Sequence, residues 1–177
     1  MSLLGFTFDN VLQGVSADVS ATGVVIPGTP EVGVISGMEE FVGDVPSDTD
    51  LVFVGFGGYT LVQSTEHVTQ GQYSGLFTGD PADGVGFATN YDADLTAYNT
   101  IFLDVTVTDV EVDGYVSLYI EGIGGSPDIV EDTTTIGATG TYTLEVDIST
   151  FSDKTQLYVS IASVNCTTSY IDNFRGE

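Results

Sequence analysis

The sequence predicts an all-β protein, built as a β-sandwich of antiparallel sheets. Three observations lead to this prediction. Helix-type periodicity is almost absent, β-branched and aromatic residues dominate, and short runs alternate between apolar and polar residues. Glycine-containing turn signals separate these runs, as they do in sandwiches. A length of 177 residues suits one domain, and neither a repeat nor a linker divides residues 1–177.

The first half of the chain has the less regular strand signals. We expect a first strand over Gly5–Asp9, followed by a loop-rich insertion at about 13–50 with one or two short strands. Three prolines and many Gly and Asp residues interrupt this insertion, and proline removes a donor from a strand ladder. Further strands are expected over 51–56, 59–68 and 72–78, with an Asp-Pro-Gly turn over 80–84.

Four strands of the second half alternate more clearly, over 101–107, 115–121, 142–148 and 157–161. Successive side chains of a strand point to opposite faces, so each of these strands buries one face and leaves the other wet. We expect the four to form one sheet with an apolar inside. The inward side chains would be Ile101, Leu103, Val105, Val107, Val116, Leu118, Ile120, Tyr142, Leu144, Val146, Ile148, Leu157, Val159 and Ile161.

The charge of the chain excludes two classes of partner. There are 26 acidic residues against Lys154 and Arg175, which gives a formal net charge of −24. Binding to nucleic acid or to an anionic membrane surface needs clusters of basic residues. The acid excess suits salt-rich or cation-rich surroundings, where screening relieves self-repulsion, although a merely soluble acidic surface is the alternative.

The sequence carries no sign of secretion or of membrane insertion. Residues 1–4 contain no basic residue and do not lead into a long apolar stretch, so we expect no signal peptide. The sequence contains no run of about 18 apolar residues, so we also expect no membrane span. Cys166 is the one cysteine and cannot form an internal disulfide. A virion component that is released by lysis would leave the cell without a classical signal.

Five stretches, taken in order, resemble the jelly-roll carbohydrate-binding modules, a galactose-binding-like family. They are residues 5–9, 64–74, 94–101, 141–147 and 170–174. The resemblance covers the first strand and roughly residue 59 onward, and it implies a jelly-roll sandwich. The chain departs from the family in having no Trp, which is a common stacking platform for sugars.

The resemblance also implies a structural calcium ion where the first and last strands meet. The matching positions are Asp9 and Asp172, and carbonyl groups near Gln70 and Gln72 would complete the site. Calcium takes 6–8 oxygen ligands, and the general excess of acid favours the ion. The alternative is that Asp9 and Asp172 only cap the ends of strands.

Catalytic signals are weak, and we expect no enzyme. Glu111 and Asp113 lie two apart, but position 116 is Val where a glycosidase motif of this kind needs a third acid. His67, the one histidine, has no neighbouring Ser or Cys motif. Cys166 is best interpreted as a small hydrophobic residue.

The polar faces of the alternating strands form the candidate ligand site. Aromatic rings that are flanked by acceptors suit a sugar, whose C–H face stacks and whose hydroxyls donate. The alternatives are a cross-strand aromatic ladder and burial against residues 13–50 or a neighbouring subunit. The candidate residues are Phe102, Asp104, Tyr115, Tyr119, Glu121 and Tyr158, beside Ser117 and Ser160.

Two functions from different classes fit these observations, and we expect the first, with the second as the alternative. The first is a non-catalytic structural protein at the surface of a virion (capsid decoration, turret or tail-associated) or of another extracellular assembly in a salt-rich environment. Its partners would be other copies of the chain or other proteins of the assembly. The lack of Trp favours this function. The second is a stand-alone glycan-binding module, which the resemblance favours.

Overall fold

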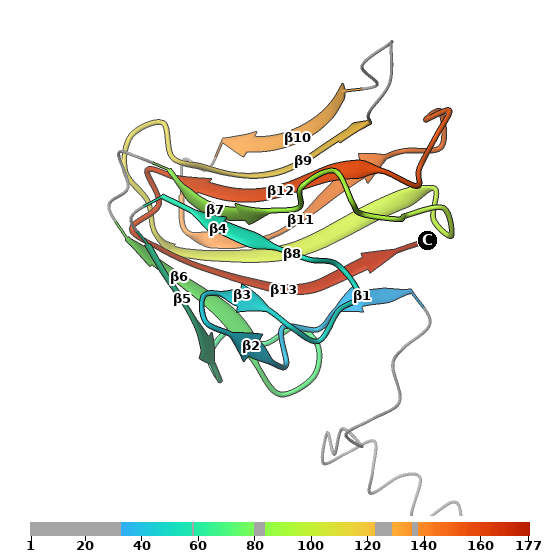
Figure 1. Cartoon of the computed structure of the whole chain (residues 1–177). Coiled ribbons are helices and arrows are strands. Elements are labelled where there is room, and N and C mark those ends of the chain that lie inside the picture. Colours follow the sequence, from blue (N-terminus) through green and yellow to red (C-terminus); the bar gives the residue numbers. More distant parts are fainter. Residues whose placement is uncertain (1–32, 58, 80–83, 123–128, 136–137) are drawn as a thin grey trace, which may run out of the picture.

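The computed structural model describes residues 33–57, 59–79, 84–122, 129–135 and 138–177 (Figure 1). Over these residues the chain contains strands and no helix, and hence no helix long and apolar enough to cross a membrane. The strands are β1 (Val34–Ser36), β2 (Phe41–Val42), β3 (Val45–Pro46), β4 (Val54–Phe56), β5 (Tyr59–Ser64), β6 (Ser74–Gly79), β7 (Val85–Ala88), β8 (Thr100–Asp109), β9 (Tyr115–Gly122), β10 (Ile129–Thr135), β11 (Gly140–Asp147), β12 (Leu157–Val164) and β13 (Thr168–Gly176).

Two antiparallel sheets lie face to face, which confirms the predicted all-β sandwich (Figure 1). The six-stranded sheet has the order β11-β8-β13-β6-β5, with β1 paired to β13. The five-stranded sheet has the order β10-β9-β12-β7-β4, and β2 and β3 form a separate hairpin. The chain passes repeatedly from one sheet to the other, so strands that are neighbours in sequence often belong to different layers.

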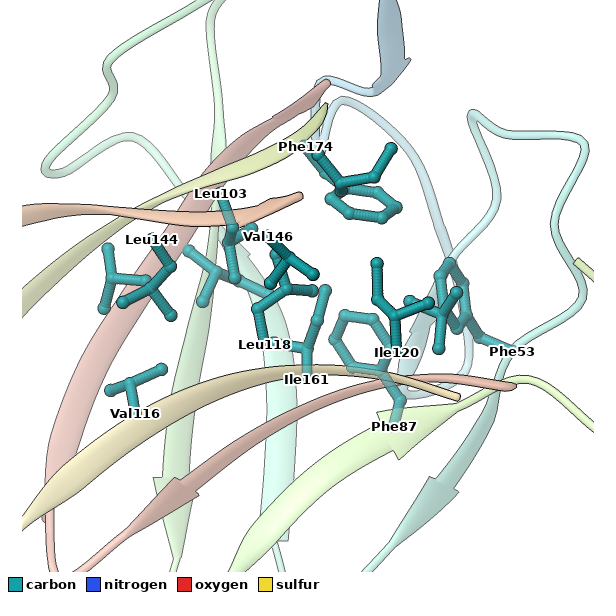
Figure 2. Close-up of a cluster of buried hydrophobic side chains, with 14 of the residues drawn as sticks. Phe53, Phe87, Leu103, Val116, Leu118, Ile120, Leu144, Val146, Ile161 and Phe174 are labelled. Atoms are coloured by element: carbon teal, nitrogen blue, oxygen red, sulfur yellow. The ribbon is translucent and has the colours of Figure 1, made fainter. Parts of the chain in front are cut away.

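The core lies between the sheets and is built from the predicted alternation (Figure 2). Phe87 packs against two other aromatic rings of this core. Its ring centroid lies 4.7 Å from that of Phe53 and 5.8 Å from that of Phe77. Each fully buried side chain of this size contributes about 1.5–3 kcal/mol. Of the predicted inward residues, Tyr142 is partly buried and the other thirteen are buried: Ile101, Leu103, Val105, Val107, Val116, Leu118, Ile120, Leu144, Val146, Ile148, Leu157, Val159 and Ile161.

The prediction that the four alternating strands form one sheet is wrong. β8 and β11 pair within the six-stranded sheet, whereas β9 and β12 pair within the five-stranded sheet. Alternation shows which side chains of a strand point inward, but both sheets of a sandwich have an apolar inner face. The pattern therefore cannot tell which sheet a strand joins.

The first half of the chain also differs in detail from the prediction. The expected first strand Gly5–Asp9, residues 13–32 of the expected insertion and most of the turn over 80–84 lie outside the described residues. Residues 33–50 contain β1, which pairs with the last strand β13, and the β2–β3 hairpin. Strands β4, β5 and β6 are shorter than, or shifted from, the ranges expected for them.

The segment 65–73 leaves the sheet and returns as a loop. His67 has a φ of 53° and Gly71 a φ of 78°, and such positive values end a strand. The loop is tied to the outer face of β13, because the backbone N–H groups of Thr69 and Gln70 donate to the carboxylate of Asp172 at 2.6 and 2.8 Å.

Candidate functional site

Three tyrosines and one glutamate meet on the outer face of the five-stranded sheet. Tyr119 and Glu121 project from β9, and Tyr158 projects from β12, where it is the register partner of Glu121. Their chain neighbours Leu118, Ile120, Leu157 and Val159 are buried in the core, so the alternation directs these side chains outward. Tyr91 comes from the segment after β7. We call Tyr91, Tyr119, Glu121 and Tyr158 the tyrosine face.

The side chains of the tyrosine face hold one another in place. The ring centroid of Tyr158 lies 5.1 Å from that of Tyr91 and 6.0 Å from that of Tyr119. The hydroxyls of Tyr91 and Tyr119 both donate to Oε2 of Glu121, at 3.3 and 3.0 Å. Partial burial and then the charge of Glu121 raise the pKa of Tyr91 above its usual value. The phenol therefore stays protonated and remains a donor at neutral pH.

Tyr91 is placed by a short segment that is fastened to β12 at both ends. The N–H of Thr89 donates to the carbonyl of Val159 at 2.9 Å, and its hydroxyl donates to the carbonyl of Leu157 at 3.0 Å. Beyond Tyr91, Ala93 and Leu157 exchange backbone hydrogen bonds at 3.2 and 2.9 Å. Tyr91 itself has a φ of 59°, a conformation that is uncommon outside glycine.

Small residues lie beside the tyrosine face. Ala88, Ser160 and Tyr119 are register partners across β7, β12 and β9. Ala88 is 6% exposed and Ser160 is 8% exposed although both point away from the core, so larger neighbours shield them. At the β4 edge, the ring of Phe56 lies over Gly86, where an added Cβ would be 2.7 Å from the ring.

The structure separates the residues that the sequence analysis grouped on one polar face. Phe102 and Asp104 project from β8 on the outer face of the six-stranded sheet, on the opposite side of the sandwich from Tyr119. The grouping is wrong for the reason given above, since β8 and β9 belong to different sheets. Tyr115 shares the outer face of β9 but lies four positions from Tyr119, roughly 13 Å along the strand.

A second polar cluster lies on the six-stranded sheet, between β8, β13 and the loop 65–73. Asp172 is 1% exposed, and its carboxylate accepts from the N–H groups of Thr69, Gln70 and Asn173. Burial raises the pKa of Asp172, although these hydrogen bonds favour its charged form. Asp104 is its register partner, and the hydroxyl of Thr69 lies 3.1 Å from a carboxylate oxygen of each acid.

Asp104 is held in its charged form by different neighbours. Its carboxylate forms an ion pair with Arg175 at 3.2 Å and accepts from Thr143 and from the side-chain amide of Asn173. Partial burial disfavours the charge, but the hydrogen bonds from Asn173 and Thr143 and the charge of Arg175 outweigh it and hold the pKa of Asp104 below its usual value. Two acids that face each other across the strands thus have opposite pKa shifts.

The residues around Asp172 fit the expected calcium ion in part. Among the described residues, Gln70 Oε1 and Asn173 Oδ1 are buried without a hydrogen-bond partner, and amide oxygens are ligands that calcium accepts. Gln70 Oε1, however, lies beside Gly37, where an added Cβ would be 2.9 Å from it. However, no group of three or more His, Cys, Asp or Glu side chains within the described ranges is placed to hold a metal. Asp9, the other expected ligand, lies outside the described residues. In the structure, the carboxylate of Asp172 accepts hydrogen bonds from N–H groups of the loop 65–73.

The comparisons with known proteins identify the fold. No protein-family model matches the chain, and no curated protein matches it. Among solved structures, a xylan-binding domain of carbohydrate-binding-module family 22 is 20% identical with a TM-score of 0.54, and the match covers 83% of this chain and 96% of that one. The C-terminal family 22 module of Clostridium thermocellum Xyn10B is 22% identical with a TM-score of 0.51, again over 83% and 96%.

A protein of another kind has a comparable fold. The K2 cleaved adhesin domain of Lys-gingipain is 14% identical with a TM-score of 0.54, and the match covers 81% of this chain and 96% of that chain. The chain therefore has the fold of a carbohydrate-binding module, as the sequence resemblance implies. Because a fold is shared by proteins of many functions, the function has to be argued from the tyrosine face.

Proposed function

We propose that the protein is a non-catalytic glycan-binding module and that the tyrosine face is its binding site. The observation that carries this proposal is the pair of tyrosine hydroxyls that converge on Glu121 beside the ring of Tyr158. The rings offer flat apolar surface to the C–H face of a sugar. The remaining lone pairs of Glu121 and of the phenol oxygens accept from sugar hydroxyls.

Two further features support binding. Tyr91 is fastened at both ends of its segment and the other three side chains stand on strands, so little conformational entropy is lost when a ligand binds. Glu121 and Tyr158 are register partners on neighbouring strands, so the acceptor and a stacking ring stand side by side on the sheet. The similarity to a solved structure that is named as xylan-binding adds support from the fold.

A binder also fits the chemistry better than a hydrolase. A glycosidase places two carboxyl groups on either side of the scissile bond, about 5–5.5 Å apart in retaining enzymes. Among the four side chains that define the tyrosine face, the one carboxylate is that of Glu121, whose Oε2 already accepts two tyrosine hydroxyls. Glu121 is thus arranged as a fixed acceptor rather than as an acid that protonates a leaving group.

The experiment is a comparison of tyrosine variants in binding to neutral polysaccharides. We expect Tyr158→Ala to weaken binding at least about tenfold, equivalent to roughly 1.4 kcal/mol, because Tyr158 contacts both other rings. Tyr73→Ala is the matched control, since Tyr73 is a partly buried tyrosine that precedes β6 in the other sheet. Affinity electrophoresis or calorimetry measures the change, and equal binding by wild type and Tyr158→Ala would show that this face is not the site.

A structural role in a surface assembly is the second candidate, and one observation favours it. The edge strand β4 and the residue two before it carry a row of exposed apolar side chains, namely Val52, Val54 and Phe56 at 62%, 51% and 38% exposure. Exposed apolar rows on edge strands are sites where chains associate. The partner would be another copy or another protein of a virion or extracellular surface, with salt screening the acidic chains.

This candidate predicts that the protein self-associates at high salt through β4. We expect sedimentation to show a larger species in molar NaCl than in dilute buffer, and Val54→Asp to abolish that species. Val112→Asp is the control, because Val112 is 85% exposed but lies in the turn between β8 and β9. If the wild-type protein stays monomeric at both salt concentrations, the self-assembly function is contradicted, and glycan binding remains as the proposed function.

A further inference from the structure

The basic side chains of the chain are few and all lie within the described residues. The sequence contains two Lys and Arg residues and one His. Arg175 lies on the six-stranded sheet, where its guanidinium pairs with Asp104 and lies 5.0 Å from the ring centroid of Phe102. It is therefore on the opposite side of the sandwich from the tyrosine face.

Lys154 and His67 are also engaged elsewhere. Lys154, between β11 and β12, donates from Nζ to the carbonyl of Tyr98 at 2.7 Å and to the side-chain oxygen of Asn99 at 3.1 Å. His67 lies in the loop 65–73 on the six-stranded sheet, and its ring centroid is 4.5 Å from that of Tyr170. None of the three basic side chains reaches the tyrosine face.

Two of the three tyrosine hydroxyls of the tyrosine face are directed at its own carboxylate. Uronate and sulfate groups are bound through charge-assisted hydrogen bonds, mostly from Arg and Lys. Here the hydroxyls of Tyr91 and Tyr119 donate to Glu121, so an approaching anion meets a fixed negative charge and finds these two donors occupied. Sugar hydroxyls, in contrast, can donate to the same carboxylate.

We propose that the tyrosine face selects neutral glycans and rejects glycans that carry uronate or sulfate groups. This inference rests on the proposed glycan-binding function. Its carrying observation is the position of Glu121 at the centre of the face, with every basic side chain of the protein committed to another part of the fold. The net charge of −24 adds a field of the same sign over the whole surface.

The test compares pairs of polysaccharides that share a backbone and differ in charge. Suitable pairs are an unsulfated and a sulfated galactan, and a fully methyl-esterified and a de-esterified galacturonan, with a chelator present so that no divalent cation bridges the acids. At low salt we expect the neutral member to bind at least about tenfold more tightly. The difference should narrow in high salt, because screening weakens the repulsion.

Each outcome separates the inference from the function on which it rests. Equal or tighter binding of the charged member at low salt overturns the selectivity while leaving glycan binding intact. Absence of binding to both members, together with an unchanged result for Tyr158→Ala, contradicts the proposed function itself.

A pair of variants shows whether the selectivity comes from the face or from the whole molecule. Glu121→Gln keeps an acceptor for the tyrosine hydroxyls but removes the local charge, and it should narrow the difference between neutral and charged members several-fold. Glu111→Gln removes one exposed charge from the turn between β8 and β9, at the far end of β9, and should leave the difference unchanged. If both variants reduce the affinity difference between neutral and charged glycans equally, the selectivity does not come from the charge of Glu121. Thermal unfolding of each variant confirms that the fold is retained.

Discussion

Tyr91 shows how a residue outside any strand becomes part of a site. The position of its ring follows from the hydrogen bonds of Thr89 and Ala93 to β12 on either side of it, and its backbone has a positive φ. Period-two alternation identifies Tyr119, Glu121 and Tyr158 as outward residues from sequence, because each stands on a regular strand. It gives no position for Tyr91, because the signal that places Tyr91 is backbone pairing over long sequence separation.

Asp172 is the residue on which the prediction of a calcium site can be tested. The calcium site that the resemblance implies stays a prediction, and it has a definite consequence. An ion that binds only the folded state stabilises it by mass action. We expect a chelator to lower the melting temperature of the wild type by several degrees and to leave that of Asp172→Asn unchanged.

The alternative role of Asp172 gives a different pattern. If the carboxylate only accepts the N–H groups of Thr69 and Gln70, the wild type melts at the same temperature with and without chelator at constant ionic strength. Asp172→Ala would still destabilise the fold, by about 1–3 kcal/mol for each buried donor that loses its acceptor. Asp109→Asn, a change at an exposed acid at the end of β8, is the control for loss of charge alone.

At the scale of elements, the sequence predicts strands well and their partners poorly. β8, β9, β11 and β12 lie close to the ranges that alternation predicts, since a buried face imposes a strict period of two. Pairing between strands depends on contacts across the fold, which the local pattern does not contain. For this reason alternation predicts Phe102 and Asp104 beside Tyr119, whereas both lie on the other outer face.

Strand β1 shows why a short strand is hard to place from sequence. It covers Val34–Ser36 and pairs with β13, within the insertion where the sequence predicts one or two short strands at no definite position. Ser36 is buried and donates to Asp48 at 2.7 Å, and Asp48 also accepts the N–H groups of Gly37 and Glu39. Such polar anchoring of a three-residue strand has no periodic signature.

For the whole molecule, the net charge of −24 affects stability in a way that individual contacts do not reveal. The acids repel one another in the folded state more than in an expanded chain, and salt screens this repulsion, since the Debye length falls from about 30 Å at 0.01 M to about 3 Å at 1 M. We therefore expect the free energy of unfolding to rise by at least about 1 kcal/mol over this range of NaCl, as measured by urea unfolding.

A charge-neutralised variant shows whether repulsion is the cause. The end of β8 and the turn that follows it carry three exposed acids, Asp109, Glu111 and Asp113. Asn is tolerated at position 113, where φ is 63°. The triple variant Asp109→Asn, Glu111→Gln, Asp113→Asn should be more stable than the wild type in dilute buffer. At about 1 M NaCl the two should converge, because screening then removes the repulsion that the substitutions relieve. A stability difference that is the same at both salts would mean that the substitutions act on the turn itself, and a wild-type stability that does not rise with salt would refute the role of the net charge.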